Sequence, residues 1–276
     1  MKFGKFIHAI APLAAIALAG AVSGCDKVDF NIDGDHIKFN GKEGKKLSEL
    51  DLTGKAPEEL ALLGPDEVRV TQGDKLAITV DGEGKDEVRF ALDGDTLGFL
   101  RGNRCSAARA VINVTLPALR EVSMLGSGRI ITGALAPNAK IVVAGSGEIE
   151  SGAVSGDKLE VTIPGSGRFR ASGSAKTLEL TILGSGAAEL DALRVEKAEV
   201  TMAGSGRATF TSDGDVEATI LGSGEVVVRG RARCKLNSVG SGRLVCEAGT
   251  TAASSDAPPA PPTPPVPPAP PTPETK

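Results

Sequence analysis

Side chains able to carry out catalysis are scarce in this 276-residue sequence. Only two histidines occur, His8 and His36, and the first lies in a segment with the features of a leader peptide. One remaining imidazole argues against a Ser-His-Asp or Cys-His catalytic centre and against a histidine-rich metal site. Trp and Tyr are absent, which argues against the flat aromatic platforms that usually line a sugar-binding cleft. We therefore identify no catalytic residue, no metal ligands and no cofactor site.

Cys25 is the cysteine whose surroundings predict a modification. Residues 1–24 begin with Lys2 and Lys5 and continue with a short apolar run, as secretory signal peptides do. The leader ends in Val22-Ser23-Gly24-Cys25, which is similar to the lipobox of bacterial lipoproteins, whose cysteine is lipidated and becomes the mature N-terminus. An ordinary leader followed by an unrelated cysteine is the alternative. The lipobox interpretation predicts membrane attachment through Cys25, because each buried CH₂ of an acyl chain contributes about 0.8 kcal/mol.

The other cysteines are Cys105, Cys234 and Cys246, an odd number for an oxidising compartment. Cys234 and Cys246 both fall at inward positions of the last repeat described below, so a disulfide between them would staple the C-terminal end. Two buried, reduced cysteines acting as small hydrophobic side chains are the alternative. A bridge requires Cα atoms within about 7 Å, which the sequence does not establish.

Acidic and hydroxyl side chains recur at fixed distances before a repeated Gly-Ser-Gly motif. Four consecutive repeats carry glutamate five residues before the motif and threonine three residues before it: Glu160, Glu179, Glu199 and Glu217, with Thr162, Thr181, Thr201 and Thr219. Stacked carboxylates about 5 Å apart repel by roughly 1 kcal/mol even in water. Two interpretations remain open: a solvated strand face, or an interaction strip whose repulsion is relieved by divalent cations or a basic partner.

The element that must position these side chains is a regular coil. Gly-Ser-Gly occurs seven times, beginning at Gly126, Gly145, Gly165, Gly184, Gly204, Gly222 and Gly240, at intervals of 18 to 20 residues. Such a period is the signature of a solenoid. Apolar residues alternate on both sides of each motif, so each side is a strand with one inward face. The sequence predicts an all-β, single-stranded parallel β-helix of about 19 residues per coil, with right-handed winding and a β-rich N-terminal lead-in.

The residue directly after each motif tests the register. These positions hold Arg129, Glu148, Arg168, Ala187, Arg207, Glu225 and Arg243. Alternating charges in a parallel ladder attract one another by about 0.2–1 kcal/mol per pair. The alternation supports the predicted stacking.

The rest of the chain divides around this domain. We assign residues 1–24 to the signal peptide, 25–65 to a lipidated N-terminus with a hairpin and linker, 66–250 to the β-helix, and 251–276 to a disordered Pro-rich tail. In the second part, Val28, Phe30 and Ile32 alternate with polar residues before an Asp-Gly-Asp turn, which predicts a hairpin ending near Phe39. The acidic spacing matches half of a calcium loop, but turn chemistry explains it better. Residues 58–63 are expected to form at most a short helix.

Charge and loop length separate the possible functions. A net charge of −4 spread along the chain gives no basic footprint for nucleic acid. Some β-helices process polysaccharides, but such enzymes need carboxylates in a cleft built by long loops. The coils of this chain vary by only two residues. A binding or structural role is favoured over a polysaccharide-processing enzyme, and a role in envelope stress or assembly stays open.

The combination of features resembles the head GIN domain family, which is described as the head of an auto-transporter adhesin. The resemblance rests on the lipobox, Gln72-Gly73-Asp74, the run Leu92–Leu97, Leu116-Pro117-x-Leu119 and the Gly-Ser-Gly repeats, and it covers about residues 66–249. It implies an exported β-helix with no catalytic residues to carry over. We expect a non-enzymatic, lipid-anchored, periplasm-facing protein of the bacterial envelope. Its partners would be the membrane, through the lipid, and an envelope or cell-wall component.

Overall fold

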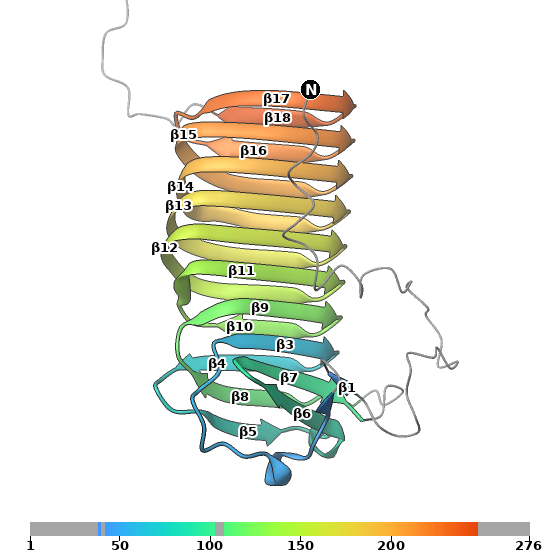
Figure 1. Ribbon diagram of the computed structural model, residues 1–276. Helices are drawn as coiled ribbons and strands as arrows, with labels where there is room; N and C mark the ends of the chain where they lie inside the picture. The colour runs from blue at the N-terminus through green and yellow to red at the C-terminus, as the bar shows by residue number, and fades with distance from the viewer. Residues whose placement is uncertain (1–37, 40–41, 103–107, 248–276) are drawn as a thin grey trace, which may run out of the picture.

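The computed structural model describes residues 38–39, 42–102 and 108–247. Within these residues, two short 3-10 helices, η1 (Leu47–Glu49) and η2 (Lys85–Glu87), interrupt a structure made of strands. The strands wind into a parallel solenoid whose coils stack along one axis (Figure 1). The prediction of an all-β solenoid with about 19 residues per coil is confirmed.

Each coil contributes one arm to each of two sheet faces. The first arms include β3 (Glu59–Gly64), β9 (Leu119–Gly126), β11 (Leu135–Gly145) and β17 (Arg233–Gly240). The second arms include β4 (Glu67–Gln72), β10 (Arg129–Thr132), β16 (Glu225–Arg229) and β18 (Arg243–Glu247). In the middle coils a second arm runs without a break into the next first arm, giving the long strands β12 (Glu148–Gly165), β13 (Arg168–Gly184), β14 (Ala187–Gly204) and β15 (Arg207–Gly222).

The Gly-Ser-Gly corners stack with a repeated hydrogen-bond pattern. The serine N–H donates to the first glycine carbonyl of the preceding coil, at 2.9 Å for Ser166 to Gly145. The first glycine of each corner has positive φ, for example +131° at Gly165, which glycine adopts without steric cost. The second glycine is needed for space, because a Cβ on Gly167 would lie 2.4 Å from Val143 Cγ1. The first glycine is therefore required by its backbone conformation, and the second by the lack of space for a Cβ.

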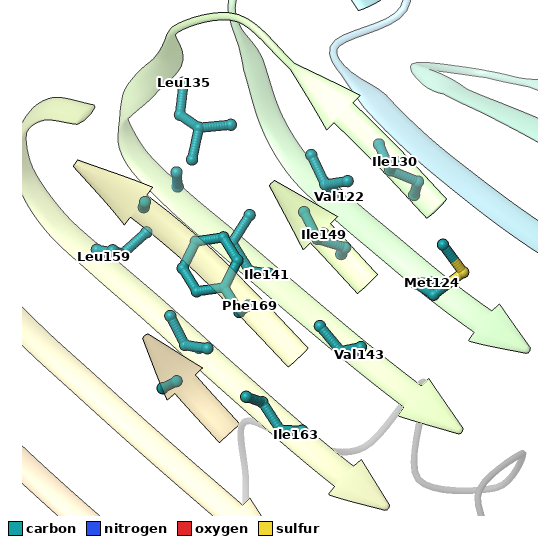
Figure 2. Close-up of a cluster of buried hydrophobic side chains, with 14 of the residues drawn as sticks. Val122, Met124, Ile130, Leu135, Ile141, Val143, Ile149, Leu159, Ile163 and Phe169 are labelled. Carbon is teal, nitrogen blue, oxygen red and sulfur yellow. The ribbon is translucent and has the colours of Figure 1, made fainter. Parts of the chain in front are cut away.

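The core lies between the two arms of each coil and runs the length of the solenoid. Inward positions predicted from the alternation are buried, and Figure 2 shows their side chains converging from both faces. Ile163, Ile182 and Ile220 stack along one column through Met202 and are fully buried. Phe169 projects from the opposite arm and is also fully buried. Aliphatic columns thus hold neighbouring coils in register, because a slip of one residue would turn each column outward.

The N-terminal end is built differently and corrects one expectation. Residues 58–63 were expected to form at most a short helix, but all of them except Glu58 belong to β3, which pairs in parallel with β9 and aligns Gly64 with Gly126. Leu60 and Leu62 are buried as inward residues of this coil. The run hides its period because Ala61 and Leu63 are also apolar, and Gly64-Pro65-Asp66 replaces the Gly-Ser-Gly signal. The solenoid therefore starts before residue 66.

Antiparallel strands complete this end. β6 (Val88–Asp93) pairs antiparallel with β7 (Thr96–Arg101), and β5 (Ala77–Asp81) pairs antiparallel with β8 (Val111–Leu116). Most of the predicted hairpin, residues 28–37, lies outside the described residues. Inside them, β1 (Lys38–Phe39) pairs with β2 (Lys42–Glu43).

Candidate interaction face

The first arms carry the predicted strip on their outward side. The pairing of β12 to β15 places the four glutamates in one column and the four threonines in a second column beside it. We call these eight residues the Glu-Thr strip: Glu160, Glu179, Glu199, Glu217, Thr162, Thr181, Thr201 and Thr219. The strands therefore pair in the register expected from the sequence.

Two lysines contact three of the four glutamates, which the sequence analysis did not anticipate. Lys158 Nζ lies 2.8 Å from Glu179 Oε2 and 3.8 Å from Glu160 Oε2. The hydrogen bond to Glu179 raises the pKa of Lys158. Lys235 Nζ lies 2.8 Å from Glu217 Oε1, and this hydrogen bond lowers the pKa of Glu217. Ion pairs to these two lysines thus partly offset the repulsion expected along the column of four carboxylates.

Glu199 is the exception in the column. Within the described residues it forms no ion pair, and it lies in register between Glu179 and Glu217. The described part of the chain contains no group of three or more His, Cys, Asp or Glu side chains placed to hold a metal ion. Glu199 is therefore the one glutamate of the strip that forms no ion pair among the described residues.

An apolar column that the sequence analysis missed borders the threonines. It consists of the residue immediately before each first glycine, and its members include Pro164, Leu183, Ala203, Leu221 and Val239. Leu183, Leu221 and Val239 are 45%, 47% and 70% exposed. The signal was present in the sequence, because this position is apolar in every repeat. The first-arm face therefore carries charged, hydroxyl and apolar columns side by side.

The threonine hydroxyls are available between these columns. Among the described residues, no side-chain hydrogen bond involves Thr162, Thr181, Thr201 or Thr219. A hollow of about 240 Å³ opens at the N-terminal end of the strip, lined by Glu59, Arg120, Glu121, Asn138, Ala139, Lys140, Lys158 and Glu160. A flat face with free hydroxyls and exposed Leu side chains can bind through hydrogen bonds and apolar burial at once.

The opposite face, made by the second arms, satisfies its own charges. The residues after the corners align as predicted, so Arg129 lies beside Glu148, and Glu225 beside both Arg207 and Arg243. Glu225 Oε2 lies 2.9 Å from Arg207 Nη2, and its Oε1 lies 2.5 Å from Arg243 Nη2. Ion pairs also cross columns, for example between Arg168 and Glu189 at 2.7 Å. This face offers few unpaired groups to a ligand.

A second hollow follows the serine corners near the N-terminal end. It measures about 480 Å³ and is lined by Pro65, Asp66, Glu67, Arg109, Ala110, Val111, Ser127, Gly128, Arg129, Ser146, Gly147, Glu148, Ser166 and Arg168. Acidic and basic side chains are balanced in this lining, and Arg129 pairs with Glu150 at 2.6 Å. The hollow therefore has no dominant charge to select a ligand.

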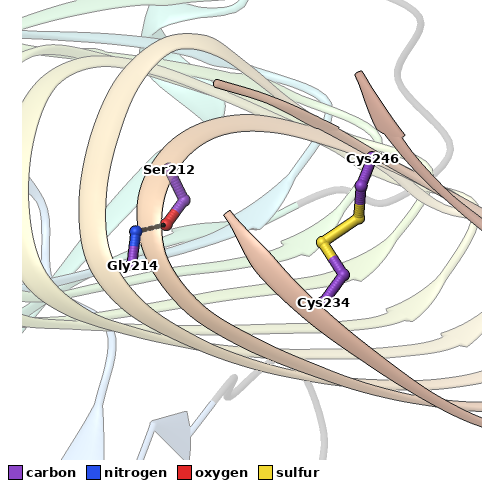
Figure 3. The surroundings of a disulfide bond; sticks show 4 residues. All are labelled: Ser212, Gly214, Cys234 and Cys246. Atoms are coloured by element: carbon purple, nitrogen blue, oxygen red, sulfur yellow. Dashed lines mark hydrogen bonds between the residues drawn. A yellow bond between two sulfur atoms is a disulfide. The ribbon is translucent and has the colours of Figure 1, made fainter. Parts of the chain in front are cut away.

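The remaining predicted residues divide by position. Cys234 and Cys246 are joined by a disulfide in the last coil, with Cα atoms 6.7 Å apart, linking β17 to β18 across the core (Figure 3). Both cysteines stand at inward positions, in register with Val216 and Val228. Cys25 and Cys105 lie outside the described residues. The described residues contain no helix that is long and apolar enough to cross a membrane.

Comparisons with known proteins agree with the fold. A family model described as "Putative auto-transporter adhesin, head GIN domain" matches residues 56–232. Two solved structures are similar: a putative adhesin from Bacteroides fragilis, at 21% identity and TM-score 0.61, and a putative lipid binding protein from Parabacteroides distasonis, at 20% and 0.57. Each alignment covers 70% of this chain and 93% of the other. No curated protein matches the chain. At such identities the two structures establish a shared fold and not a shared ligand.

Proposed function

Because the chain belongs to the head GIN domain family of putative auto-transporter adhesins, we propose that it is a non-enzymatic binding module of the bacterial cell envelope. The observation that carries the proposal is the difference between the two outward faces. The first-arm face exposes Leu183 and Leu221 beside free threonine hydroxyls, while the opposite face neutralises itself with ion pairs. We assign binding to the Glu-Thr strip together with its apolar column.

The chemistry of this face suits a flat partner, such as an envelope protein or a cell-wall component. Apolar area removed from water contributes about 25 cal/mol per Å², and hydrogen bonds to the threonines add direction. Carboxylates such as Glu199 favour a basic partner, because the strip can gain an ion pair that it lacks internally. A polysaccharide-processing enzyme is the alternative. It is less well supported, since most of the charged side chains that line the two hollows are already engaged in ion pairs.

A matched pair of variants tests the assignment. Leu183→Ser with Leu221→Ser removes exposed apolar side chains from the strip face, and Ile131→Ser with Val227→Ser makes the same change at two outward, half-buried apolar positions of the opposite face. Sedimentation of purified protein with isolated bacterial envelopes measures binding. We expect about a tenfold loss for the strip variant, corresponding to about 1.4 kcal/mol, and little change for its control. Equal binding by both variants would contradict the proposal, and turnover of an acidic polysaccharide would support the alternative.

Lipid anchoring through Cys25 is part of the same proposal, supported by the Val22-Ser23-Gly24-Cys25 motif. Cys25→Ser is expected to abolish incorporation of labelled palmitate, with Cys105→Ser as the matched control that retains it. Unchanged palmitate labelling of Cys25→Ser would contradict lipid anchoring through Cys25. The binding face is tested independently of this result when the envelope assay uses purified protein that carries no lipid.

A further inference from the structure

The C-terminal end of the solenoid leaves two strand edges without a partner in the described residues. β17 pairs only with β15, and β18 only with β16. Leu236 stands in register with the fully buried Ala218, yet it is 40% exposed because no further coil covers it. An uncovered edge displays a row of backbone donors and acceptors that can pair with another strand.

The C-terminal tail does not fit this edge. One period of 18 residues after Cys234, Leu236 and Ser238 come Ala252, Ser254 and Asp256. A further coil would therefore point a carboxylate and a hydroxyl into the core, where an unpaired charge is strongly unfavourable. The run of prolines that begins at Pro258 cannot donate ladder hydrogen bonds.

Residues 28–34 have the sequence that the edge requires. Val28, Phe30 and Ile32 alternate with Asp29, Asn31 and Asp33, and Gly34 follows. The same pattern occurs in the first arm of the preceding coil, Val216-Glu217-Ala218-Thr219-Ile220-Leu221-Gly222, whose inward residues are buried. With Gly34 placed over Gly240, the apolar residues lie over Cys234, Leu236 and Ser238.

Charge agrees with this register. Asp29 then lies beside Lys235, and Asn31 stacks on Asn237 in the column that holds threonine in earlier coils. The last coil is rich in cations that already pair with acids one coil below: Arg233 with Asp215 at 2.7 Å, and Lys235 with Glu217 at 2.8 Å. An acidic strand above would continue the alternation of sign along the ladder.

The strand cannot come from the same molecule. Lys38 is held beside Glu43, two residues from Lys45, whose backbone pairs with Phe90 of β6 at the opposite end. The strand order places nine spacings between β6 and β17, or about 43 Å at 4.8 Å each. Gly34 is four residues from Lys38, a reach of about 14 Å. The occupant must therefore belong to a second copy.

We propose that residues 28–34 of one molecule add as a parallel strand to β17 of another. The donor segment and the acceptor edge are different surfaces, so the contact is head-to-tail and can repeat to form chains of molecules. This inference does not depend on the Glu-Thr strip, because it uses the end of the solenoid and not its faces.

Site-specific cross-linking tests the register. One preparation of the mature chain carries Asn31→Cys and a second carries Asn237→Cys, and the two are mixed before oxidation. Adjacent parallel strands bring these positions within disulfide range, so a dimer is expected only from the mixture. Asn31→Cys mixed with Asn113→Cys, on β8 at the other end, is the matched control, and wild type gives the background from Cys25 and Cys105.

Self-association provides the second measurement. Sedimentation velocity of wild type is expected to show species that grow with concentration, and Phe30→Asp is expected to reduce association at least tenfold, while Asp35→Asn does not. Phe30→Asp need not destabilise the solenoid, because it lies outside the described coils. A monomer at all concentrations, a cross-link that forms equally with Asn113→Cys, or an unaffected Phe30→Asp variant would each overturn the proposal.

Discussion

At the N-terminal end of the solenoid the outermost strands, β5 and β6, run antiparallel to their neighbours, whereas at the C-terminal end β17 and β18 stay parallel to theirs (Figure 1). The first end is filled by Phe90 and Phe99, whose rings meet edge to face with centroids 5.7 Å apart. The second end has a disulfide in place of aromatic packing. The antiparallel strands close the core at the N-terminal end. The parallel strands at the C-terminal end leave edges to which another strand could pair.

Charge is handled differently at the two ends as well. Asp66 and Arg101 form an ion pair with only 2% and 3% of their side chains exposed, and Asp66 also accepts a hydrogen bond from the Ala110 N–H at 2.8 Å. The ion pair of Asp215 with Arg233 is 65% and 77% exposed. A buried ion pair at the N-terminal end and an exposed one at the C-terminal end predict that the N-terminal end is the more sensitive of the two to loss of a charged partner.

The largest contrast is expected from core truncation. Phe99→Ala removes a fully buried ring and should lower the free energy of unfolding by about 4 kcal/mol, since the surrounding strands cannot collapse into the cavity. Leu236→Ala removes a side chain already 40% exposed and should cost under about 1 kcal/mol. Urea denaturation followed by circular dichroism measures both. Equal losses would show that the C-terminal end is covered in solution.

Removing one partner of each ion pair should give the next largest difference. Asp66→Asn leaves the Arg101 guanidinium buried without its counter-charge and should cost about 3 kcal/mol. Asp215→Asn acts on an exposed pair that solvent screens, so its effect should be much smaller. Thermal melts of the two variants provide the comparison. A smaller loss of thermal stability for Asp66→Asn than for Asp215→Asn would contradict this expectation.

Loss of the disulfide should act locally. Replacing Cys234 and Cys246 together with alanine opens a loop with a sequence separation of 12 residues, for which chain-entropy models give about 2–3 kcal/mol. Amide hydrogen exchange in β17 and β18 should accelerate about 30-fold, as about 2 kcal/mol of local stability implies. Exchange in β9 serves as the internal control and should not change. Acceleration along the whole solenoid would mean that the disulfide stabilises all of the coils and not the C-terminal end alone.

Acid should slightly destabilise the C-terminal end, because it protonates exposed carboxylates that are hydrogen-bonded there. A hydrogen bond from the Arg231 N–H lowers the pKa of Asp213, and hydrogen bonds from Arg233 and Lys235 lower those of Asp215 and Glu217. Groups whose folded pKa is depressed contribute stability above their unfolded values of 3.8 for Asp and 4.5 for Glu, and that contribution is lost as the pH falls through the folded values.

Phosphine reduction of the Cys234–Cys246 disulfide reports this loosening, because the reagent works in acid. Because acid also protonates the phosphine and slows it, each rate is divided by that of a small-molecule disulfide at the same pH, and we expect this ratio to be higher at pH 3 than at pH 6. The variant Asp213→Asn, Asp215→Asn, Glu217→Gln should show a flatter dependence of the ratio on pH, and a wild-type ratio that does not rise in acid would contradict the expectation.

The sequence was most informative where the period is regular. Gly-Ser-Gly spacing and alternating apolar residues set the coil length, the inward positions such as Leu180 and Val200, and the columns of charge. Such features depend on neighbours one period away, so they can be counted along the chain. The alignment of Glu179 with Glu199 is one example.

The sequence was less informative where contacts depend on side-chain direction or on strands out of phase with the repeat. Lys158 reaches Glu179 diagonally, one coil away and two residues along, and no column count shows such a pair. β3 was missed because its outward residues are apolar too. The buried Asp66–Arg101 pair joins residues 35 positions apart in a region without the repeat, so no motif announced it.

The direction of the inter-coil hydrogen bonds determines how the molecule responds to force. The strands lie across the axis, so the bonds between coils, such as that from the Ser166 N–H to the Gly145 carbonyl, connect one coil to the next along it. Tension between the two ends would load these bonds a few at a time, peeling one coil before the next, and each coil of 18 to 20 residues would release about 60–70 Å of slack. The disulfide prevents residues 234–246 from extending. Under tension the solenoid would thus lengthen in steps, and each step would dissipate work before the whole chain is extended.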